Sequence, residues 1–420
     1  MVGLEKPPLP KQVYIPLSQH TGKACIPEVR PGESVVTGQR IAGIQAAIWA
    51  PVHASLSGKV TAVQDWPHPV LGRAKAIVIE SNGEDRVAED KRKREPEEVN
   101  KLTSEEIRNL VFSAGIVGMG GASFPTHIKL NPPKPVDTLI INGAECEPYL
   151  MSDYRLMVEK TGEIIKGIEL ITKCLGVKRV IVAIEENKPE AIKNFNYELR
   201  ITCLAGRQAN YELRILKSQY PQGGEKQLIK NLLKKEVPRG KLPFDVGVVV
   251  HNVATCFAIY EAVYLNKPLY ERIVTVTGSC VLNSKVLLVR IGTPIKELIA
   301  FCGLKEEPAK IILGGPMMGI AQFTDEVPVI KSTTGIILFN QKEARIYEEG
   351  SCIRCGACIR ECPVGLMPCL INLATERGLW QKAKDYGALD CIECGLCSFA
   401  CPAKRRLVQS IRRAKLELGK

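Results

Sequence analysis

Residues 352–363 read CIRCGACIRECP, and residues 391–402 read CIECGLCSFACP. Both stretches have the spacing C-x2-C-x2-C-x3-C-P, which is typical of the loops that bind a four-iron, four-sulfur cluster. Thiolates are the soft ligands that such a cluster needs, and the two-residue gaps allow one turn to place three sulfurs around it. The repeat therefore predicts a ferredoxin-like helical domain with two 4Fe-4S clusters over residues 340–420.

The fourth cysteine of each stretch is expected to bind the cluster of the other stretch, as it does in two-cluster ferredoxins. The ligands predicted for the first cluster are Cys352, Cys355, Cys358 and Cys401. The ligands predicted for the second cluster are Cys391, Cys394, Cys397 and Cys362. Zinc ribbons are one alternative, but a zinc site has no use for a fixed cysteine before proline. Disulfides are another, and they would need an oxidising compartment, for which no signal peptide is expected.

Length and composition limit what the rest of the chain can be. Its 420 residues are enough for several domains, and 45% of them are hydrophobic, so substantial cores are expected. No apolar run of about 18 residues occurs, so no transmembrane segment is expected. The net charge is +12, yet aromatic residues make up only 5% and no nucleic-acid-binding motif is present. Nucleic acid is therefore not an expected partner.

Residues 1–90 have the pattern of short β-strands separated by glycines. Within them, residues 29–42 and 50–60 resemble a biotinyl or lipoyl carrier domain, which is a barrel-sandwich hybrid with a modified lysine at a hairpin tip. Here the tip would lie near Ala46–Ile48, where no lysine occurs. We therefore expect a docking or structural module without a carrier function.

Residues 104–268 alternate between helical patterns and apolar strand patterns. The strands are expected at residues 138–141, 179–184 and 246–250. Such alternation predicts a mostly parallel sheet with helices on its faces. Residues 270–325 return to short β elements with one helix, so the predicted fold is a multidomain combination of α/β and β parts.

Residues 115–129, GIVGMGGASFPTHIK, form a glycine-rich loop that follows a predicted helix. Glycines let the backbone approach a ligand, and the unpaired N–H groups of such a loop can surround a phosphate. Lys129 would add a positive charge for that phosphate. The glycine count alone is a weak indicator, because turns and tight packing explain many such loops and a dinucleotide fingerprint would follow a strand.

The amino-acid sequence of this loop resembles the flavin loop of the NADH-binding subunit of complex I. Three further segments match that family in the same order, namely NGAECEP at residues 142–148, YPQGGE at residues 220–225 and VVHNVAT at residues 249–255. Residues 273–300 resemble its soluble-ligand-binding β-grasp domain, which predicts that domain over residues 270–325. The chain departs from the family at four positions: an arginine, an aspartate, a glutamate and an asparagine are replaced by Met119, Ala144, Gly224 and His251.

This resemblance implies an FMN- and NADH-binding domain over residues 104–268 and the residues of its site. The FMN phosphate would contact Gly118, Gly120, Gly121 and Lys129. The flavin ring or ribityl chain would bond to Asn142, Asn252 and Thr255. Phe124 would stack near the nicotinamide, and the ribose of NADH would bind Glu147 and Glu225. Glu145 and Gly223 lie in the same matching segments and complete the predicted cofactor-binding set, which contains no catalytic acid or base.

The order of parts along the whole chain resembles the C subunit of the Rnf electron-transport complexes. Its signatures are matched by residues 16–22, 143–149 and 220–228. The resemblance implies a peripheral subunit of an ion-translocating ferredoxin:NAD oxidoreductase on the cytoplasmic side of the cell inner membrane. The implied cofactors are FMN and two 4Fe-4S clusters, with NAD(H) as substrate. The implied partners are the other subunits of that membrane complex, including an iron-sulfur subunit.

Three other functions stay open at this point. A cobalamin reductase of bacterial microcompartments has a similar flavin fold and paired clusters, but its barrel-like module lies toward the other end of the chain. An electron-feeding protein of amino-acid reductases has a closer layout. The third alternative is a docking and relay subunit without NADH chemistry, which the four replaced residues motivate.

Overall fold

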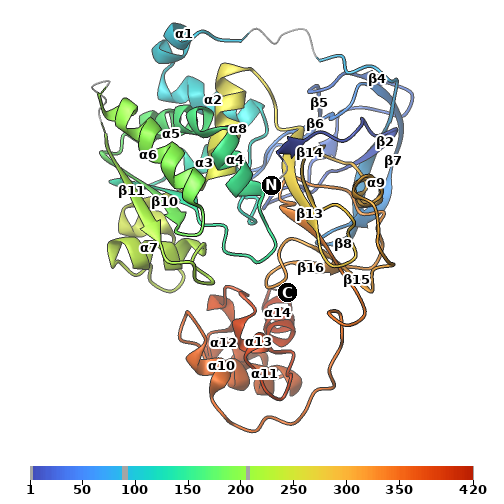
Figure 1. The fold of residues 1–420 in the computed structure, drawn as a ribbon, viewed down its shortest axis with the longest axis vertical. Coiled ribbons are helices and arrows are strands. Elements are labelled where there is room, and N and C mark those ends of the chain that lie inside the picture. Colours follow the sequence, from blue (N-terminus) through green and yellow to red (C-terminus); the bar gives the residue numbers. More distant parts are fainter. Residues whose placement is uncertain (1–2, 88–92, 205–208, 420) are drawn as a thin grey trace.

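The computed structural model describes residues 3–87, 93–204 and 209–419 (Figure 1). An N-terminal β region and a six-stranded sheet lie on one side, an α/β region lies on the other, and a C-terminal helical region lies below them (Figure 1). The predicted end of the first domain, near residue 90, falls outside the described residues.

The N-terminal β region consists of two antiparallel sheets that share one core. Alternate side chains on their strands, such as Ile15, Ile41 and Ile77, are fully buried in this core. The first sheet has the order β2 (Gln12–Pro16), β8 (Gly72–Ser81), β7 (Gly58–His68) and β4 (Ser34–Val35). The second has the order β3 (Ile26–Pro27), β5 (Arg40–Gly43) and β6 (Val52–His53).

The α/β region has a four-stranded parallel sheet, with strands at the three predicted positions and a fourth at its edge. Its order is β11 (Asn210–Leu216), β10 (Arg179–Glu185), β9 (Thr138–Gly143) and β12 (Val248–Asn252). Strand β9 is buried on both faces, which explains its continuous apolar sequence. Leu139 and Ile141 pack into the core on one face, whereas Ile140 packs into the core on the other.

Helices cover both faces of this parallel sheet. One core contains side chains of α2, α4, α5, α6 and α8, and the opposite core contains side chains of α7. Helix α2 begins after Thr103, whose hydroxyl accepts from the N–H of Glu106 at 3.2 Å while the Glu106 carboxylate accepts from the N–H of Thr103. The helices are α1 (Pro96–Lys101), α2 (Ser104–Ser113), α3 (Thr126–Lys129), α4 (Ser152–Glu159), α5 (Thr161–Leu175), α6 (Pro189–Leu204), α7 (Glu225–Leu233) and α8 (Val253–Tyr264).

The β elements predicted over residues 270–325 belong to a six-stranded mixed sheet, which also contains strands from outside that range. Strand β1 comes from the start of the chain, and β17 pairs with both β13 and β15 although it follows them in the sequence. Periodicity reports only local structure, so such distant pairings leave no signal in it. The order is β1 (Leu4–Glu5), β14 (Lys285–Arg290), β13 (Glu271–Thr277), β17 (Gly335–Phe339), β15 (Lys310–Leu313) and β16 (Ile320–Gln322), with α9 (Ile295–Cys302) beside it.

The C-terminal helical region carries both cysteine stretches. Its helices are α10 (Ala357–Arg360), α11 (Pro368–Glu376), α12 (Trp380–Asp385), α13 (Leu396–Phe399) and α14 (Leu407–Leu418). Helices α11 and α14 pack together through the fully buried Ile371 and Ile411. Among the residues described, none of the helices combines the length and the apolar character that a membrane crossing requires.

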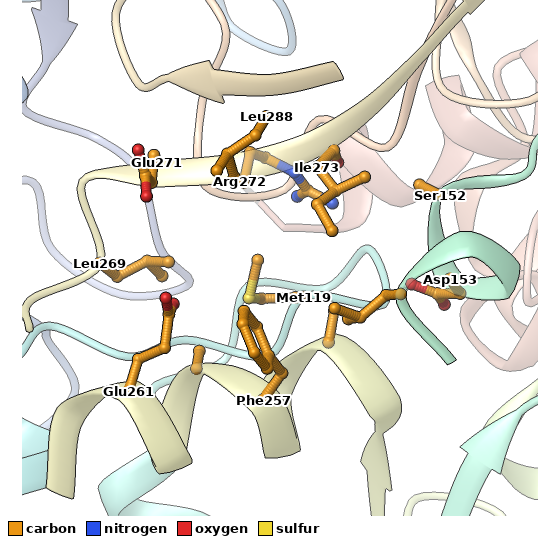
Figure 2. A pocket seen from close by; sticks show the side chains of 13 residues that line it. Met119, Ser152, Asp153, Phe257, Glu261, Leu269, Glu271, Arg272, Ile273 and Leu288 are labelled. Atoms are coloured by element: carbon orange, nitrogen blue, oxygen red, sulfur yellow. Dashed lines mark hydrogen bonds between the residues drawn. The ribbon is translucent and has the colours of Figure 1, made fainter. Parts of the chain in front are cut away.

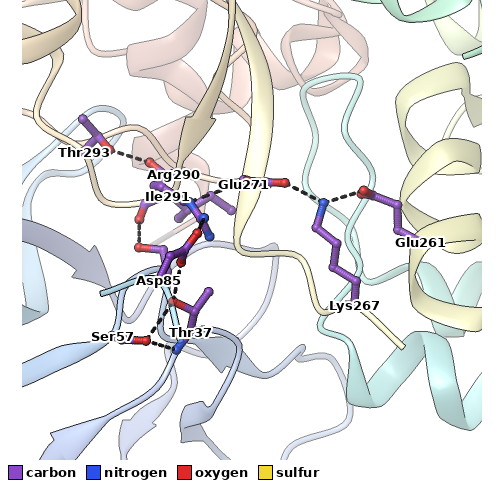
Figure 3. A network of polar contacts seen from close by, with 10 residues as sticks. Thr37, Ser57, Asp85, Glu261, Lys267, Glu271, Arg290, Ile291 and Thr293 are labelled. Atoms are coloured by element: carbon purple, nitrogen blue, oxygen red, sulfur yellow. Dashed lines mark hydrogen bonds and ion pairs between the residues drawn. The ribbon is translucent and has the colours of Figure 1, made fainter. Parts of the chain in front are cut away.

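A network of polar contacts joins the N-terminal β region to the six-stranded sheet and to helix α8 (Figure 3). Asp85 pairs with Arg290 of β14, and Arg290 lies 3.6 Å from Glu271 of β13. Glu271 lies 2.6 Å from Lys267, which also pairs with Glu261 of α8. Because the side chains of Lys267 and both glutamates are largely buried, this alternation of charges sets the position of α8 relative to the sheet.

Lys331 joins three parts of the chain from a fully buried position. Its Nζ donates to the carbonyl oxygens of Pro51 in the N-terminal β region and Gly115 in the glycine-rich loop, at 2.7 Å each. Its backbone N–H donates to the side chain of Gln19 at 3.1 Å. Burial lowers the pKa of Lys331 to about 7, and the nearby Cys25 thiol opposes this only in part. His20, which burial and Lys331 keep neutral by lowering its pKa, lies beside it.

The lowered pKa of Lys331 predicts a pH dependence of stability. An unfolded lysine has a pKa of about 10.4, so between pH 7 and pH 10 the unfolded chain binds more protons at this group than the folded chain does, by up to one. Stability from this group therefore rises with pH across that window, by at most about 1.4 kcal/mol per pH unit. We expect the stability advantage of the wild type over Lys331→Met to grow between pH 7 and pH 8.5, measured by thermal unfolding.

The control for this measurement is Lys75→Met, which removes a lysine whose side chain is 65% exposed. Its unfolding temperature should follow that of the wild type at every pH. A constant difference between wild type and Lys331→Met across the same pH range would contradict the predicted titration of Lys331.

Candidate functional site: two cysteine clusters beside a glycine-rich loop

The four cysteines predicted for the second cluster line one cavity in the C-terminal helical region. Cys362 reaches it from the first stretch, whereas the other three cysteines come from the second. Leu366, Val408 and Ile411 form apolar walls of the same cavity. Within the described residues, no three His, Cys, Asp or Glu side chains are grouped closely enough to hold a single metal ion. The four cysteines therefore line a shared cavity rather than a site for a single ion.

The first-cluster cysteines are less enclosed. Cys358 and Cys401, one from each stretch, lie in the same apolar group, whereas Cys352 and Cys355 are exposed. Cys369 of α11 also lies in this group, and its thiol is close enough to Cys358 to form a hydrogen bond. Sequence reasoning missed Cys369 because it stands outside both stretches and no spacing points to it.

The electrostatics of both groups fit iron-sulfur clusters. Burial and the neighbouring thiols of Cys391 and Cys394 raise the pKa of Cys397 to about 12. Burial and the thiol of Cys369 raise the pKa of Cys358 to about 11. Thiolates this buried and this close together need compensating positive charge. The irons of a cluster supply that charge and bind thiols in their deprotonated form.

Backbone donors already point at two of the sulfurs. The N–H of Leu366 donates to the sulfur of Cys362, and the N–H of Glu393 donates to the sulfur of Cys391, at 3.3 Å each. Such donors favour the charged thiolate and influence the potential of a cluster. Helix α14 supports the same loop, because Lys415 donates to the carbonyl oxygen of Cys391 at 2.6 Å.

The loops that line the second-cluster cavity contact the α/β region. The Tyr220 hydroxyl donates to the carbonyl oxygen of Cys394 at 2.7 Å. The side chain of Gln227 in α7 donates to the carbonyl oxygen of Pro363 at 3.0 Å. Tyr220 lies in one of the matching segments but was not among the predicted site residues, because nothing in the local sequence shows that its hydroxyl reaches a cysteine loop.

The glycine-rich loop leaves a row of backbone donors available. The N–H of Gly118 bonds to the carbonyl oxygen of Phe124 at 2.8 Å, and the N–H of Met119 donates to the Thr255 hydroxyl at 3.0 Å. Within the described residues, the N–H groups of residues 120–123 donate no hydrogen bond. Gly121 has a φ of +121°, and an added Cβ there would meet no atom within 4 Å. Successive free N–H groups on an open loop fit a phosphate.

The polar residues at the ends of β9 and β12 hold the loops around this site. The side chain of Asn142 donates to the carbonyl oxygen of Gly223 at 2.9 Å. The side chain of Asn252 accepts from the N–H of Ala254 at 2.8 Å and donates to Asp153 at 2.6 Å. Gly120 is close to Asn252, since an added Cβ would lie 3.3 Å from the Cβ of that asparagine. The structure therefore brings the predicted glycines and asparagines to one edge of the parallel sheet.

Lys129 and Glu225, both predicted to bind cofactor, lie together at the same edge. The Nζ of Lys129 is 2.9 Å from the carboxylate of Glu225 and 2.6 Å from the carbonyl oxygen of Val250. The side chain of Lys129 is still 27% exposed. A ligand phosphate would therefore compete with Glu225 for this ammonium group.

The other two predicted glutamates bind backbone groups. Glu145 accepts from the N–H groups of Asp153 and Tyr154 at the start of α4, at 3.0 Å each. Burial and the nearby Asp153 carboxylate raise the pKa of Glu145 to about 7. Glu147 accepts from the N–H groups of residues 317 and 318, at 3.1 and 2.8 Å. Phe124, which was predicted to stack near the nicotinamide, is half-buried.

Two of the four replaced residues point away from the open side of the loop. Met119 is buried, and Figure 2 shows its side chain in a cavity between Phe257 of α8 and Ile273 of β13. His251 of β12 is fully buried, and burial lowers its pKa well below the usual range, so it is neutral. Ala144 packs against the core on the α7 face, and Gly224 is the cap residue of α7.

Four domain families match successive parts of the chain. They are the RnfC barrel sandwich hybrid domain over residues 2–84, the Nuo51 FMN-binding domain over residues 111–261, the SLBB domain over residues 273–321 and the 4Fe-4S dicluster domain over residues 344–402. These matches confirm the predicted order of a barrel-sandwich part, an FMN-binding part and a two-cluster part. They also confirm FMN and two 4Fe-4S clusters as the cofactors of the chain.

Curated relatives match the chain over nearly its whole length. It is 46% identical over 99% of its residues to the C subunit of the proton-translocating ferredoxin:NAD(+) oxidoreductase complex of Clostridium ljungdahlii, of which it covers 90%. It is 43% identical over 97% of its residues to the C subunit of the Na(+)-translocating ferredoxin:NAD(+) oxidoreductase complex of Acetobacterium woodii, of which it covers 91%. It is 44% identical over 99% of its residues to the C subunit of the ion-translocating oxidoreductase complex of Rhodobacter capsulatus, of which it covers 79%.

A solved structure shares the fold at low sequence identity. The NAD+-reducing NiFe hydrogenase in its H2-reduced state superposes with a TM-score of 0.53 and 16% identity, covering 80% of this chain and 66% of that chain. At this identity the likeness shows a common fold and nothing of the chemistry.

The crossed ligand sets predict different results for two cysteine substitutions. Cys401→Ala removes a ligand of the first cluster, so bound iron after anaerobic reconstitution should fall by about half. Cys369→Ala removes a neighbouring thiol outside both sets and should retain all the iron. Iron and sulfide analysis, with EPR spectra of the dithionite-reduced chains, measures both. Loss of iron from Cys369→Ala and full iron in Cys401→Ala would instead make Cys369 the ligand.

Proposed function

The chain belongs to the family of C subunits of ion-translocating ferredoxin:NAD(+) oxidoreductase complexes, and on this premise we propose that it passes electrons between NAD(H), FMN and two 4Fe-4S clusters in such a complex. It is an oxidoreductase subunit with an FMN-binding domain and a dicluster domain. The proposal is supported by identities of 46% and 43% to two such subunits across at least 97% of the chain.

The observation that supports the proposed electron route is the hydrogen bond from Tyr220 to Cys394. Tyr220 begins the loop whose Gly223 carbonyl accepts from Asn142, at the strand end beside the glycine-rich loop. Cys394 is a proposed ligand of the second cluster. We therefore place the second cluster between the flavin site and the first cluster.

In the proposed flavin site, this chain supplies positioning and charge. The N–H groups of residues 120–123 and the ammonium of Lys129 would hold the phosphate of FMN. FMN, when bound, accepts hydride from a two-electron donor and releases electrons singly to the clusters. Asn142, Asn252 and Thr255 maintain the loop geometry and stand within the same site. Glu145 and Glu147 would support the site indirectly, by holding backbone segments, because their carboxylates already accept from backbone N–H groups.

The first cluster is the proposed exit to another subunit. The proposed ligands Cys352 and Cys355 are exposed. Ile353, which lies between them in the sequence, and Phe399, two residues before Cys401, have 66% and 75% of their surface exposed. An exposed apolar rim around a cluster suits the docking of an iron-sulfur subunit of the same complex. Because the relatives are subunits of ion-translocating complexes, we place the chain peripherally, at the cytoplasmic face of the cell inner membrane.

The proposed domain limits are those of the sequence prediction, and two strands from outside the third domain add to its sheet. The limits are residues 1–90, 104–268, 270–325 and 340–420. The β-grasp assignment of the third domain is supported by the match to the SLBB domain and by the packing of α9 beside a mixed sheet. Strand β1, from the start of the chain, and strand β17, which follows residue 325, pair with strands of that sheet.

An anaerobic NADH titration tests the proposed function. The purified chain, reconstituted with FMN and clusters, should lose its flavin absorbance at about 0.1 mM NADH and then show cluster reduction. A chain that binds FMN but stays oxidised would contradict NADH chemistry and leave a relay function. Reduction of the clusters by dithionite in the same sample would show that the clusters themselves are intact.

The Tyr220 contact predicts a selective kinetic defect. Tyr220→Phe removes the hydroxyl that holds the second-cluster loop against the α/β region, so cluster reduction after NADH should slow by about two- to tenfold. Flavin reduction by NADH should keep its wild-type rate, because the phenol does not touch the glycine-rich loop. Stopped-flow absorbance separates the two steps.

The matched control is Tyr14→Phe, whose hydroxyl donates to Gln12 within the N-terminal β region at 2.7 Å. This variant should show wild-type rates for both steps. Equal cluster-reduction rates in Tyr220→Phe and wild type would mean that the contact has no role in the electron route.

A further inference from the structure

The N-terminal β region lacks a carrier lysine, yet two of its segments lie against the glycine-rich loop. We propose that this region is a positioning part of the flavin site, and that Thr21 holds the glycine-rich loop in its phosphate-binding conformation. This inference rests on the proposed function, because it concerns the same flavin site.

Thr21 binds the loop through two hydrogen bonds. Its hydroxyl donates to the carbonyl oxygen of Ala122 at 2.7 Å, and its N–H donates to the carbonyl oxygen of Ser123 at 3.1 Å. In a planar trans peptide the C=O and the following N–H point in opposite directions. The bond to Ala122 therefore turns the N–H of Ser123 away from Thr21.

The loop needs such support because its backbone is in an unfavourable conformation. Ser123 has a φ of +50°, a region that side chains other than glycine rarely occupy. Gly121 has a φ of +121°, which only glycine adopts readily. Without bonds to its carbonyl groups, this segment could relax and turn a carbonyl oxygen toward the phosphate position, where it would repel the anion.

A second anchor lies at the start of the same loop. Gly115 and Pro51 share the buried ammonium of Lys331, and an added Cβ at Gly115 would lie 2.4 Å from the carbonyl oxygen of Pro51. Trp49, next to the tip, contacts Phe112 of α2 edge-on with ring centres 4.9 Å apart. The N-terminal β region thus contacts the loop at residue 115 and again at residues 122–123.

The hairpin tip and the Thr21 segment support each other. Gly22 has a φ of +122°, and an added Cβ there would lie 2.2 Å from the carbonyl oxygen of Ile48. Only glycine allows this approach, so the close contact with the tip at Ala46–Ile48 fixes the backbone position of Gly22 and of the neighbouring Thr21. The part of the barrel that presents a lysine in carrier domains is used here to position a loop.

Thr21→Val tests the role of the hydroxyl while it keeps the shape of the side chain. The flavin-free chain, with clusters intact, should bind FMN about three- to tenfold more weakly, measured by quenching of FMN fluorescence. Hydrogen exchange of the peptide that covers residues 118–125 should be faster than in the wild type before any FMN is added. Thr21→Ser keeps a hydroxyl and should restore both values.

Thr61→Val is the matched control, because the Thr61 hydroxyl also donates to a carbonyl oxygen, that of Val78 within the N-terminal β region. It should leave FMN affinity and loop exchange unchanged. Wild-type affinity and wild-type exchange in Thr21→Val would overturn the inference.

A measurement on the wild type makes the test independent of how any variant folds. FMN should slow hydrogen exchange at residues 20–25 as well as at residues 118–125, because the two segments are bonded. Protection confined to residues 118–125 would overturn the inference and leave the proposed function intact. Failure of the wild type to bind FMN at all would instead overturn the proposed function itself.

Discussion

Four cysteine thiols, three from one stretch and one from the other, have to line the same cavity before a cluster can form between them. Buried thiolates repel one another, and only the positive charge of the irons makes their convergence favourable. In this chain the cavity that collects Cys362, Cys391, Cys394 and Cys397 lies against the loop that begins at Tyr220. The position of the α/β region relative to the C-terminal helices, and with it the proposed electron route, depends on this contact.

Three parts of the chain contribute to the flavin side of this route. The parallel sheet supplies the strand ends that carry Asn142 and Asn252, and the segment before β17 supplies Lys331. The N-terminal β region supplies Thr21, which bonds the glycine-rich loop from outside. The alternating ion pairs from Asp85 to Glu261 keep these parts in a constant relation (Figure 3). A loop with strained backbone can stay open only because all three parts surround it.

The sequence predicted the features whose signal is local. Cysteine spacing was sufficient to expect Cys362 beside the second stretch, and continuous apolar runs were sufficient to expect β9, β10 and β12. The bond from Tyr220 to Cys394, the pairing of β1 with β14 and the bonds of Thr21 could not be predicted, because each joins segments that lie far apart in the sequence. Several predicted contact residues, such as Asn252 and Glu145, hold backbone groups as well, which a set of matching motifs does not reveal.

The central claim is that electrons from NADH reach the first cluster only through the second. The most direct test is freeze-quench EPR of Cys394→Ala, reconstituted with FMN and iron and mixed anaerobically with NADH. The account predicts that the flavin is reduced while the first cluster stays oxidised, although dithionite still reduces it. Reduction of the first cluster by NADH at the wild-type rate in this variant would contradict the account.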